Sequence, residues 1–121
     1  MKSTYVFLIG LLVQMYLDSS FQTCSTYPGK LSLIIHHIVS MYLLIGGFVY
    51  NPMYHLVFLI GLLLHWMTND NRCRLTQITN RLCGFDESRS FRDLVYHITT
   101  NRNILYLLVL LLLVYDIRRI I

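Results

Sequence analysis

Apolar residues in this chain come in blocks, and most charged residues collect between the blocks. Four blocks stand out, at about residues 4–18, 31–50, 53–67 and 104–121. The second is 20 residues long without a formal charge, which is about the length needed to cross a bilayer. The pattern predicts an all-α fold, an integral membrane bundle of four transmembrane helices within a single domain, 1–121.

The segments between the blocks predict how the helices connect. Tyr27-Pro-Gly29 is expected to end the polar connector 19–30, and Asn51-Pro52 separates the second block from the third. A link as short as Asn51-Pro52 predicts that the helices on either side are antiparallel neighbours. The block at 4–18 is short and follows a lone lysine like a signal peptide, but no small-residue cleavage site follows it. We therefore expect it to remain as the first span.

The polar connector 68–103 contains two amphipathic pieces, predicted to be short surface helices between the third and fourth spans. Their apolar residues are Leu75, Ile78 and Leu82, with Gly84 as a stop, and then Phe91, Leu94, Val95 and Ile98. The connector also holds six of the ten basic residues. Lys30 is predicted to lie on the same side of the membrane. Because basic residues gather on the cytoplasmic side of membrane proteins, this count predicts that the loop 68–103 is cytoplasmic.

Composition supports the bilayer as the environment of the chain. The sequence is 55% hydrophobic and 13% charged, whereas a soluble domain has about a quarter of its residues charged. The net charge of +4 comes mainly from arginines beside apolar blocks, which favours lipid headgroups over nucleic acid as partner. The expected partners are the lipid bilayer and other membrane protein subunits or a second copy, and no nucleic acid.

Histidines provide the main candidate chemistry. In an antiparallel pair that turns at 51–52, His36 and His37 lie level with Trp66 and Met67, beside His65. Asp70 and Cys73 follow from the same end of the bundle. The candidate metal or cofactor ligands are therefore His36, His37, His65, Cys73 and Asp70.

Two interpretations of this group remain open. Imidazole and thiolate are ligands for haem, iron or zinc, yet adjacent histidines on a helix point about 100° apart and cannot both face one partner. Interfacial histidines hydrogen-bonded between helices account for the pattern more simply than a metal or haem site, so no cofactor is predicted. The flanking Arg72 and Arg74 would lower the pKa of an exposed Cys73 thiol. Three cysteines without a CxxC pair indicate neither a disulfide framework nor a zinc knuckle.

Three glycines in the central blocks predict close helix packing. Small residues let helices approach each other in lipid. With the same antiparallel level rule, Gly46 would face Val57, and Gly61 would face Tyr42. Gly47 belongs to the same packing position as Gly46.

Several of these residues carry a resemblance. His36 is followed by Gly46-Gly47, His55, Cys73-Arg-Leu-Thr76 and Asn80-Arg-Leu. This order resembles a family of small uncharacterised four-helix bacterial membrane proteins, whose Cys-Pro-Leu-Thr motif is followed by Glu-Asn. The similarity covers about residues 31–84 and implies four helices, with His55, Leu75, Thr76 and Asn80 as motif positions. Arg74 replaces the proline and Thr79 the acidic residue, and the family implies no activity.

Two functions from different classes fit these observations. The first is a polytopic membrane protein with a structural or interaction role, as a subunit of a larger membrane or virion assembly. The second is a membrane oxidoreductase or metal- or haem-binding protein that uses the histidines and Cys73. A small oligomeric pore is a third idea, but the leucine-rich last block offers no polar lining.

Overall fold

The computed structural model describes residues 2–18, 20–85 and 101–121 of the chain, and all regular elements among them are helices. They are α1 (Lys2–Leu17), α2 (Ser20–Thr23), α3 (Tyr27–Val49), α4 (Pro52–Thr68), α5 (Arg74–Cys83) and α7 (Arg102–Ile120). The prediction of an all-α fold is confirmed. The second amphipathic piece, from Phe91 to Ile98, lies outside the described residues.

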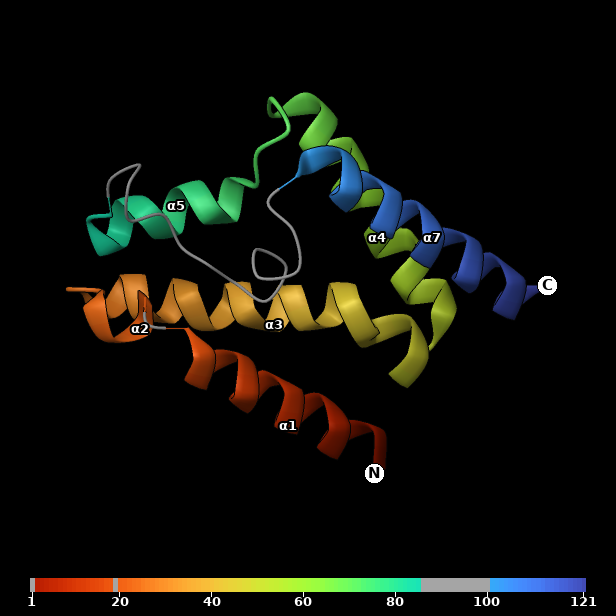
Figure 1. The fold of residues 1–121 in the computed structure, drawn as a ribbon, viewed down its shortest axis with the longest axis horizontal. Coiled ribbons are helices and arrows are strands. Elements are labelled where there is room, and N and C mark those ends of the chain that lie inside the picture. The colour runs from red at the N-terminus through yellow and green to blue at the C-terminus, as the bar shows by residue number, and fades with distance from the viewer. Residues whose placement is uncertain (1, 19, 86–100) are drawn as a thin grey trace.

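Helix α3 is the element against which the others are arranged (Figure 1). Helices α1 and α5 run along it on different sides, and α4 and α7 form a pair at its C-terminal end. Both chain termini lie toward that same end of the molecule (Figure 1). The described part is therefore a three-helix layer joined to a two-helix arm, rather than four helices side by side.

Local capping explains why α3 is longer than predicted. The Thr26 side chain accepts a hydrogen bond from the Gly29 backbone N–H at 3.1 Å, and Pro28 occupies the first turn, where its missing N–H costs nothing. Tyr27-Pro-Gly29 therefore opens the helix instead of ending a connector. At α4, Asn51 caps in the same way by accepting from the Met53 N–H at 2.9 Å.

The prediction that α3 and α4 lie side by side along their length is wrong. Helix α4 meets α3 near the turn and then diverges from it toward α7 (Figure 1). Near the turn, the rings of Tyr42 and Phe58 lie 5.0 Å apart. At the far end, Trp66 packs against Tyr106 of α7, with ring centroids 5.6 Å apart. The surface of α3 that the end of α4 was expected to cover is occupied by α5.

Two apolar clusters stabilise the described helices, one where the layer meets the arm and one within the layer. The larger joins α3, α4 and α7 through Leu43, Leu59, Trp66, Leu105, Val109 and Leu112. The smaller contains Leu33 and a disulfide between Cys24 and Cys83, which ties the segment before α3 to the end of α5. The expectation that the cysteines form no disulfide framework is therefore wrong for this pair.

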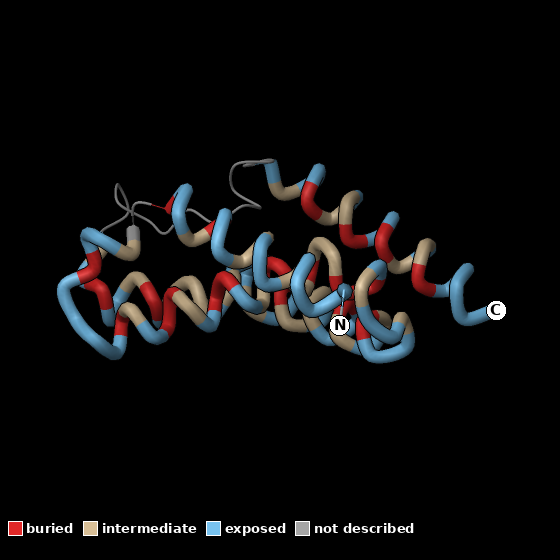
Figure 2. The backbone as a smooth tube through the Cα atoms, turned by 90° about the horizontal axis from the view of Figure 1, so that it is seen from below, coloured by how far each residue is buried: buried red, intermediate tan, exposed pale blue. Residues whose placement is uncertain are grey.

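Buried and exposed residues alternate along the long helices (Figure 2), and burial does not simply follow apolar character. His37, His55, Thr79 and Asp116 are fully buried, whereas Leu12, Val57, Leu107 and Leu111 are more than half exposed. In α5 the buried residues are Thr79 and Cys83, whereas the apolar side chains of Ile78 and Leu82 are exposed.

Of the described helices, α3 has the length and apolar character to cross a membrane, while α1 and α4 are apolar but shorter. The coarse prediction of an apolar, helical chain with a membrane-crossing candidate is confirmed to this extent.

Candidate functional site: a thiol and imidazole cluster between α3 and α5

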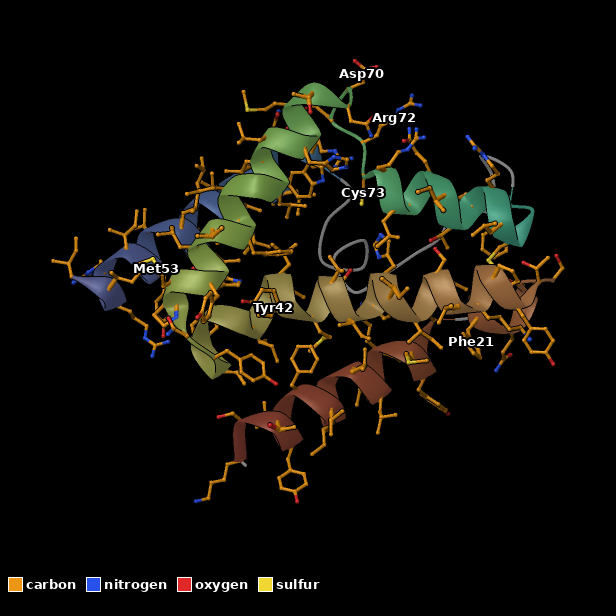
Figure 3. The ribbon with its side chains drawn as sticks, turned by 180° about the vertical axis from the view of Figure 1, so that it is seen from behind. Phe21, Tyr42, Met53, Asp70, Arg72 and Cys73 are labelled. Carbon is orange, nitrogen blue, oxygen red and sulfur yellow. A yellow bond between two sulfur atoms is a disulfide. The ribbon has the colours of Figure 1, made fainter. Side chains whose placement is uncertain are left out.

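A tight turn after α4 places Cys73 against α3. Asp70 and Asn71 both adopt left-handed backbone conformations, with φ of 52° and 58°, which short polar side chains tolerate. The Asn71 N–H donates to the Trp66 carbonyl at 2.7 Å, so the chain reverses within a few residues. Figure 3 shows Asp70 and Arg72 on the outside of this turn, and Cys73 where the chain enters α5.

The Cys73 thiol meets the imidazole of His36, which is 6% exposed. Cys73 Sγ lies 4.0 Å from His36 Nε2. The same nitrogen shares a 2.7 Å hydrogen bond with the Thr76 hydroxyl, one turn into α5. On the other side of the ring, Ser40 Oγ lies 3.3 Å from Nδ1. The imidazole is thus held between two hydroxyls, one from each helix, with the thiol beside it.

This environment makes the thiol unusually acidic. Burial raises the pKa of Cys73, but contacts with His36 and with the backbone and hydroxyl of Thr76 outweigh it. The pKa falls from 9.0 to about 7. The direction agrees with the sequence-based expectation, although the cause does not, because the flanking Arg72 and Arg74 are exposed and the lowering comes from His36 and Thr76.

The other predicted ligands do not join this cluster. His37 Nε2 lies 2.8 Å from Asp18 Oδ2, on the side of α3 that faces α1. His65 accepts a hydrogen bond from the Arg74 backbone N–H at 2.9 Å, and Asp70 is exposed. The predicted convergence of His36, His37 and His65 is therefore wrong, because His37 faces α1 rather than α5 and the end of α4 diverges from α3 (Figure 1).

The fit to a metal is poor for the same reason. Across residues 2–18, 20–85 and 101–121, no three histidine, cysteine or acidic side chains are close enough to hold a metal ion.

Besides the pair of His37 and Asp18, a second buried pair of a histidine and an aspartate lies near the C-terminal end of α3. His55 Nδ1 is 2.6 Å from Asp116 Oδ2, and His55 Nε2 is 3.1 Å from the Leu43 carbonyl. Both side chains are fully buried. Sequence reasoning assigned no partner to Asp18 or Asp116. The available signal was a carboxylate inside or at the end of an apolar block, which is costly unless it is paired.

The three glycines predicted to pack closely differ in how much space surrounds them. A Cβ on Gly47 would collide with the Asp116 carboxylate and lie 2.7 Å from His55 Nδ1, and a Cβ on Gly46 would lie 2.7 Å from His55 Cδ2. Gly46 therefore contacts His55 and Tyr42, whereas the predicted neighbour Val57 is exposed. A Cβ on Gly61 would meet nothing within 4 Å among the described residues apart from the adjacent residues and backbone of its own helix, so the predicted contact between Gly61 and Tyr42 is wrong.

A matched pair of substitutions tests this difference. We expect Gly47→Ala to lower the free energy of unfolding by about 1–3 kcal/mol, because the added methyl group displaces His55 and Asp116. Gly61→Ala should leave stability unchanged or raise it by up to about 1 kcal/mol, since alanine favours a helix and nothing obstructs it. Denaturant unfolding in detergent micelles measures both. Equal losses in the two variants would contradict the packing role of Gly47.

The remaining motif positions lie on α5. Thr79 is fully buried, and its hydroxyl is 2.5 Å from that of Ser32 on α3. The Asn80 carbonyl accepts from the Phe85 N–H at 2.9 Å where α5 ends at Gly84, whose φ is 73°. Gly84 is thus the helix stop that was predicted. Leu75 is half-buried beside the cluster.

Comparison with known proteins adds no relative from which a role could be transferred. No family model matches this chain, and no curated protein and no solved structure matches it significantly.

Proposed function

We propose that this chain is a small multi-pass integral membrane protein in which α1, α3, α4 and α7 cross the bilayer, with a structural or interaction role in a larger membrane assembly. The observation that carries the proposal is the inverted distribution of polarity, in which paired polar side chains are buried and leucine, isoleucine and valine are exposed. In water this arrangement would leave a large apolar surface exposed to solvent. In lipid the same arrangement is favourable, because the exposed apolar side chains contact lipid tails and the buried polar side chains find partners between helices.

Exposed apolar residues occur on all four proposed spans. On α1 they are Tyr5, Leu8, Ile9, Leu12 and Val13, on α3 Leu31, Ile35 and Phe48, on α4 Val57, Ile60 and Leu64, and on α7 Leu107, Leu110, Leu111 and Val114. Tyrosines and arginines lie near several helix ends, where headgroups favour them. The surface available to partners is therefore apolar, which suits lipid, another membrane subunit or a second copy.

The helix lengths are compatible with a thin bilayer. Helices α1, α4 and α7 have 16, 17 and 19 residues, which correspond to about 24, 26 and 29 Å at the usual helical rise. A hydrocarbon core is about 30 Å thick, and local thinning accommodates a short span at modest cost. The four-span topology also agrees with both termini lying toward one end of the molecule (Figure 1).

The disulfide indicates that the connector before α3 and the connector after α4 lie on the same side of the membrane. Cys24 precedes α3 and Cys83 ends α5, so the bond requires the connectors before α3 and after α4 to share one side, as four spans demand. Disulfides persist in oxidising compartments. Our proposal therefore puts this face outside the cytoplasm, opposite to the side expected from the arginine count.

Cysteine accessibility tests the topology directly. In a Cys73→Ser background expressed in a bacterial inner membrane, we expect Arg72→Cys to react with an impermeant maleimide in intact cells. Lys2→Cys, on the other face, should react only after permeabilisation. Alkaline carbonate should leave both variants in the membrane fraction. Extraction by carbonate would contradict membrane insertion, and labelling of both cysteines from the same side would contradict four spans.

A second candidate function, a membrane oxidoreductase, is favoured by the contact between Cys73 and His36. Its metal- or haem-dependent form has less support, since the five predicted ligands do not converge. A visible absorption spectrum and elemental analysis of the purified protein test that form, and stoichiometric iron, zinc or haem would establish it.

A further inference from the structure

We propose that Cys73 and His36 form a nucleophilic thiol site that exchanges with small disulfides, with Thr76 and Ser40 as positioning residues for the imidazole. This inference goes beyond the membrane architecture and gives the second candidate function a specific reaction. It does not depend on the number of spans, because the cluster lies between the N-terminal half of α3 and the start of α5.

The geometry is that of an activated nucleophile. A thiol within reach of an imidazole, whose ring is in turn held by a third group, is the arrangement used by nucleophilic cysteines. Here the three groups are the Cys73 thiol, the His36 ring and the Ser40 hydroxyl. Cys73 also occupies the N-cap of α5, where the helix dipole favours a thiolate. Cys73 as a residue is only half-buried, at the point where the chain enters α5, so the proposal requires a small reagent to reach its thiol from that side.

The cysteine inventory limits which thiol reaction is possible. Cys73 is the one free thiol among the three cysteines, since Cys24 and Cys83 are bonded to each other. Cys83 lies at the other end of α5, about 15 Å away along a helix of 10 residues. No second thiol of the chain can therefore resolve a bond formed at Cys73. The site is monothiol, and its product is a mixed disulfide with an external partner.

The setting favours a disulfide as the electrophile. The Cys24–Cys83 bond indicates an oxidising compartment, in which small disulfides are available. The best attacking thiol in exchange has a pKa near the ambient pH, because a lower pKa sacrifices nucleophilicity and a higher one leaves too little thiolate. The pKa of Cys73, about 7, meets this condition.

The proposed step is balanced without any cofactor. His36 takes the proton from Cys73, and the thiolate attacks one sulfur of a disulfide RSSR. A bond forms between Cys73 Sγ and that sulfur while the S–S bond of RSSR breaks. The electron pair leaves on the second sulfur, which receives the proton from His36 and departs as RSH. Cys73 is oxidised, because its sulfur enters the mixed disulfide. RSSR is reduced, because one of its two sulfurs leaves as the thiol RSH while the other stays bonded to Cys73.

The pH dependence of this exchange is the decisive test. Purified full-length protein in detergent is mixed with glutathione disulfide, and mixed-disulfide formation at Cys73 is followed by intact mass. We expect the rate to rise with a midpoint near pH 7. In His36→Gln the midpoint should move toward 9.0, the ordinary value for the thiol. At pH 7 the variant loses most of its thiolate but gains intrinsic nucleophilicity, so the rate should fall about sixfold.

At a pH above the pKa of the Cys73 thiol in both proteins, the order of the two exchange rates should reverse. Both thiols are then fully ionised, and the more basic thiolate of His36→Gln should react severalfold faster than that of the wild type. A merely structural effect of the substitution would not produce this crossover. Arg72→Gln is the matched control. It removes an exposed charge next to Cys73 in the sequence that does not contribute to the lowered pKa, so it should keep the wild-type midpoint.

Three results would overturn the proposal. The first is a wild-type midpoint near 9.0, which can be measured even if His36→Gln fails to fold. The second is the same profile in wild type and His36→Gln. The third is a mixed disulfide that forms only after the protein is denatured. Membrane labelling in the topology experiment is independent of all three, so a failure of either proposal is distinguishable from a failure of the other.

Discussion

Replacing both Cys24 and Cys83 with serine should lower the free energy of unfolding by about 4 kcal/mol. The bond closes a loop of 59 residues, and opening it releases the conformational entropy that the crosslink removes from the unfolded chain. The bond also lies next to Leu33 in the smaller apolar cluster, so its loss loosens the contact between α3 and α5. Fluorescence of Trp66 during denaturant unfolding in micelles measures the change.

Two comparisons separate the crosslink from the side chains. Cys73→Ser removes a cysteine without touching the bond and should change stability by less than about 1 kcal/mol. The single variant Cys83→Ser should cost as much as the double variant, because the two residues act as one unit. A loss in Cys73→Ser equal to that of the double variant would contradict a Cys24–Cys83 bond.

Asp116→Ala is expected to cost about 3 kcal/mol of folding free energy. The side chains of Asp116 and His55 are fully buried, with Oδ2 and Nδ1 2.6 Å apart, so truncation leaves Nδ1 of a buried imidazole without its carboxylate partner. It also opens space between α7 and Gly47, where the carboxylate now packs. Thermal unfolding in detergent, followed by helicity, measures the loss.

The conservative variant isolates the hydrogen bond. Asp116→Asn keeps the shape and an acceptor oxygen for His55, so it should lose roughly 1 kcal/mol. Leu111→Ala is the matched control on α7, because Leu111 is 59% exposed, and its effect should be below about 0.5 kcal/mol. If Asp116→Ala behaved like Leu111→Ala, the pair with His55 would contribute nothing measurable.

The helices themselves could be predicted from the sequence to within a few residues. Apolar blocks predicted α1, α3, α4 and α7, and Asn51-Pro52 and Gly84 marked true helix boundaries. These features are local, because a cap or a proline acts within one turn. The same local logic misplaced the start of α3, since Tyr27-Pro-Gly29 is compatible with both a turn and a helix N-terminus.

The candidate site was predicted only in part. His36 and Cys73 were named together and do meet, but the argument that placed them beside His65 required α3 and α4 to stay adjacent. A short link establishes that two helices touch at the turn, not that they remain parallel. The far end of α4 instead packs against α7, where Trp66 contacts Tyr106, 40 residues later in the chain.

The sequence by itself determined that this chain is helical, where most helices begin and end, and that the block forming α3 is long and apolar enough to cross a bilayer. Only the tertiary structure decided which polar groups meet: Asp18 with His37, Asp116 with His55, Cys24 with Cys83 and Cys73 with His36. The reason is physical. Apolar periodicity identifies an inward face only when water surrounds the protein, whereas on helices with apolar residues all round it selects no face. Contacts between polar residues distant in sequence then set the packing, and no local pattern encodes them.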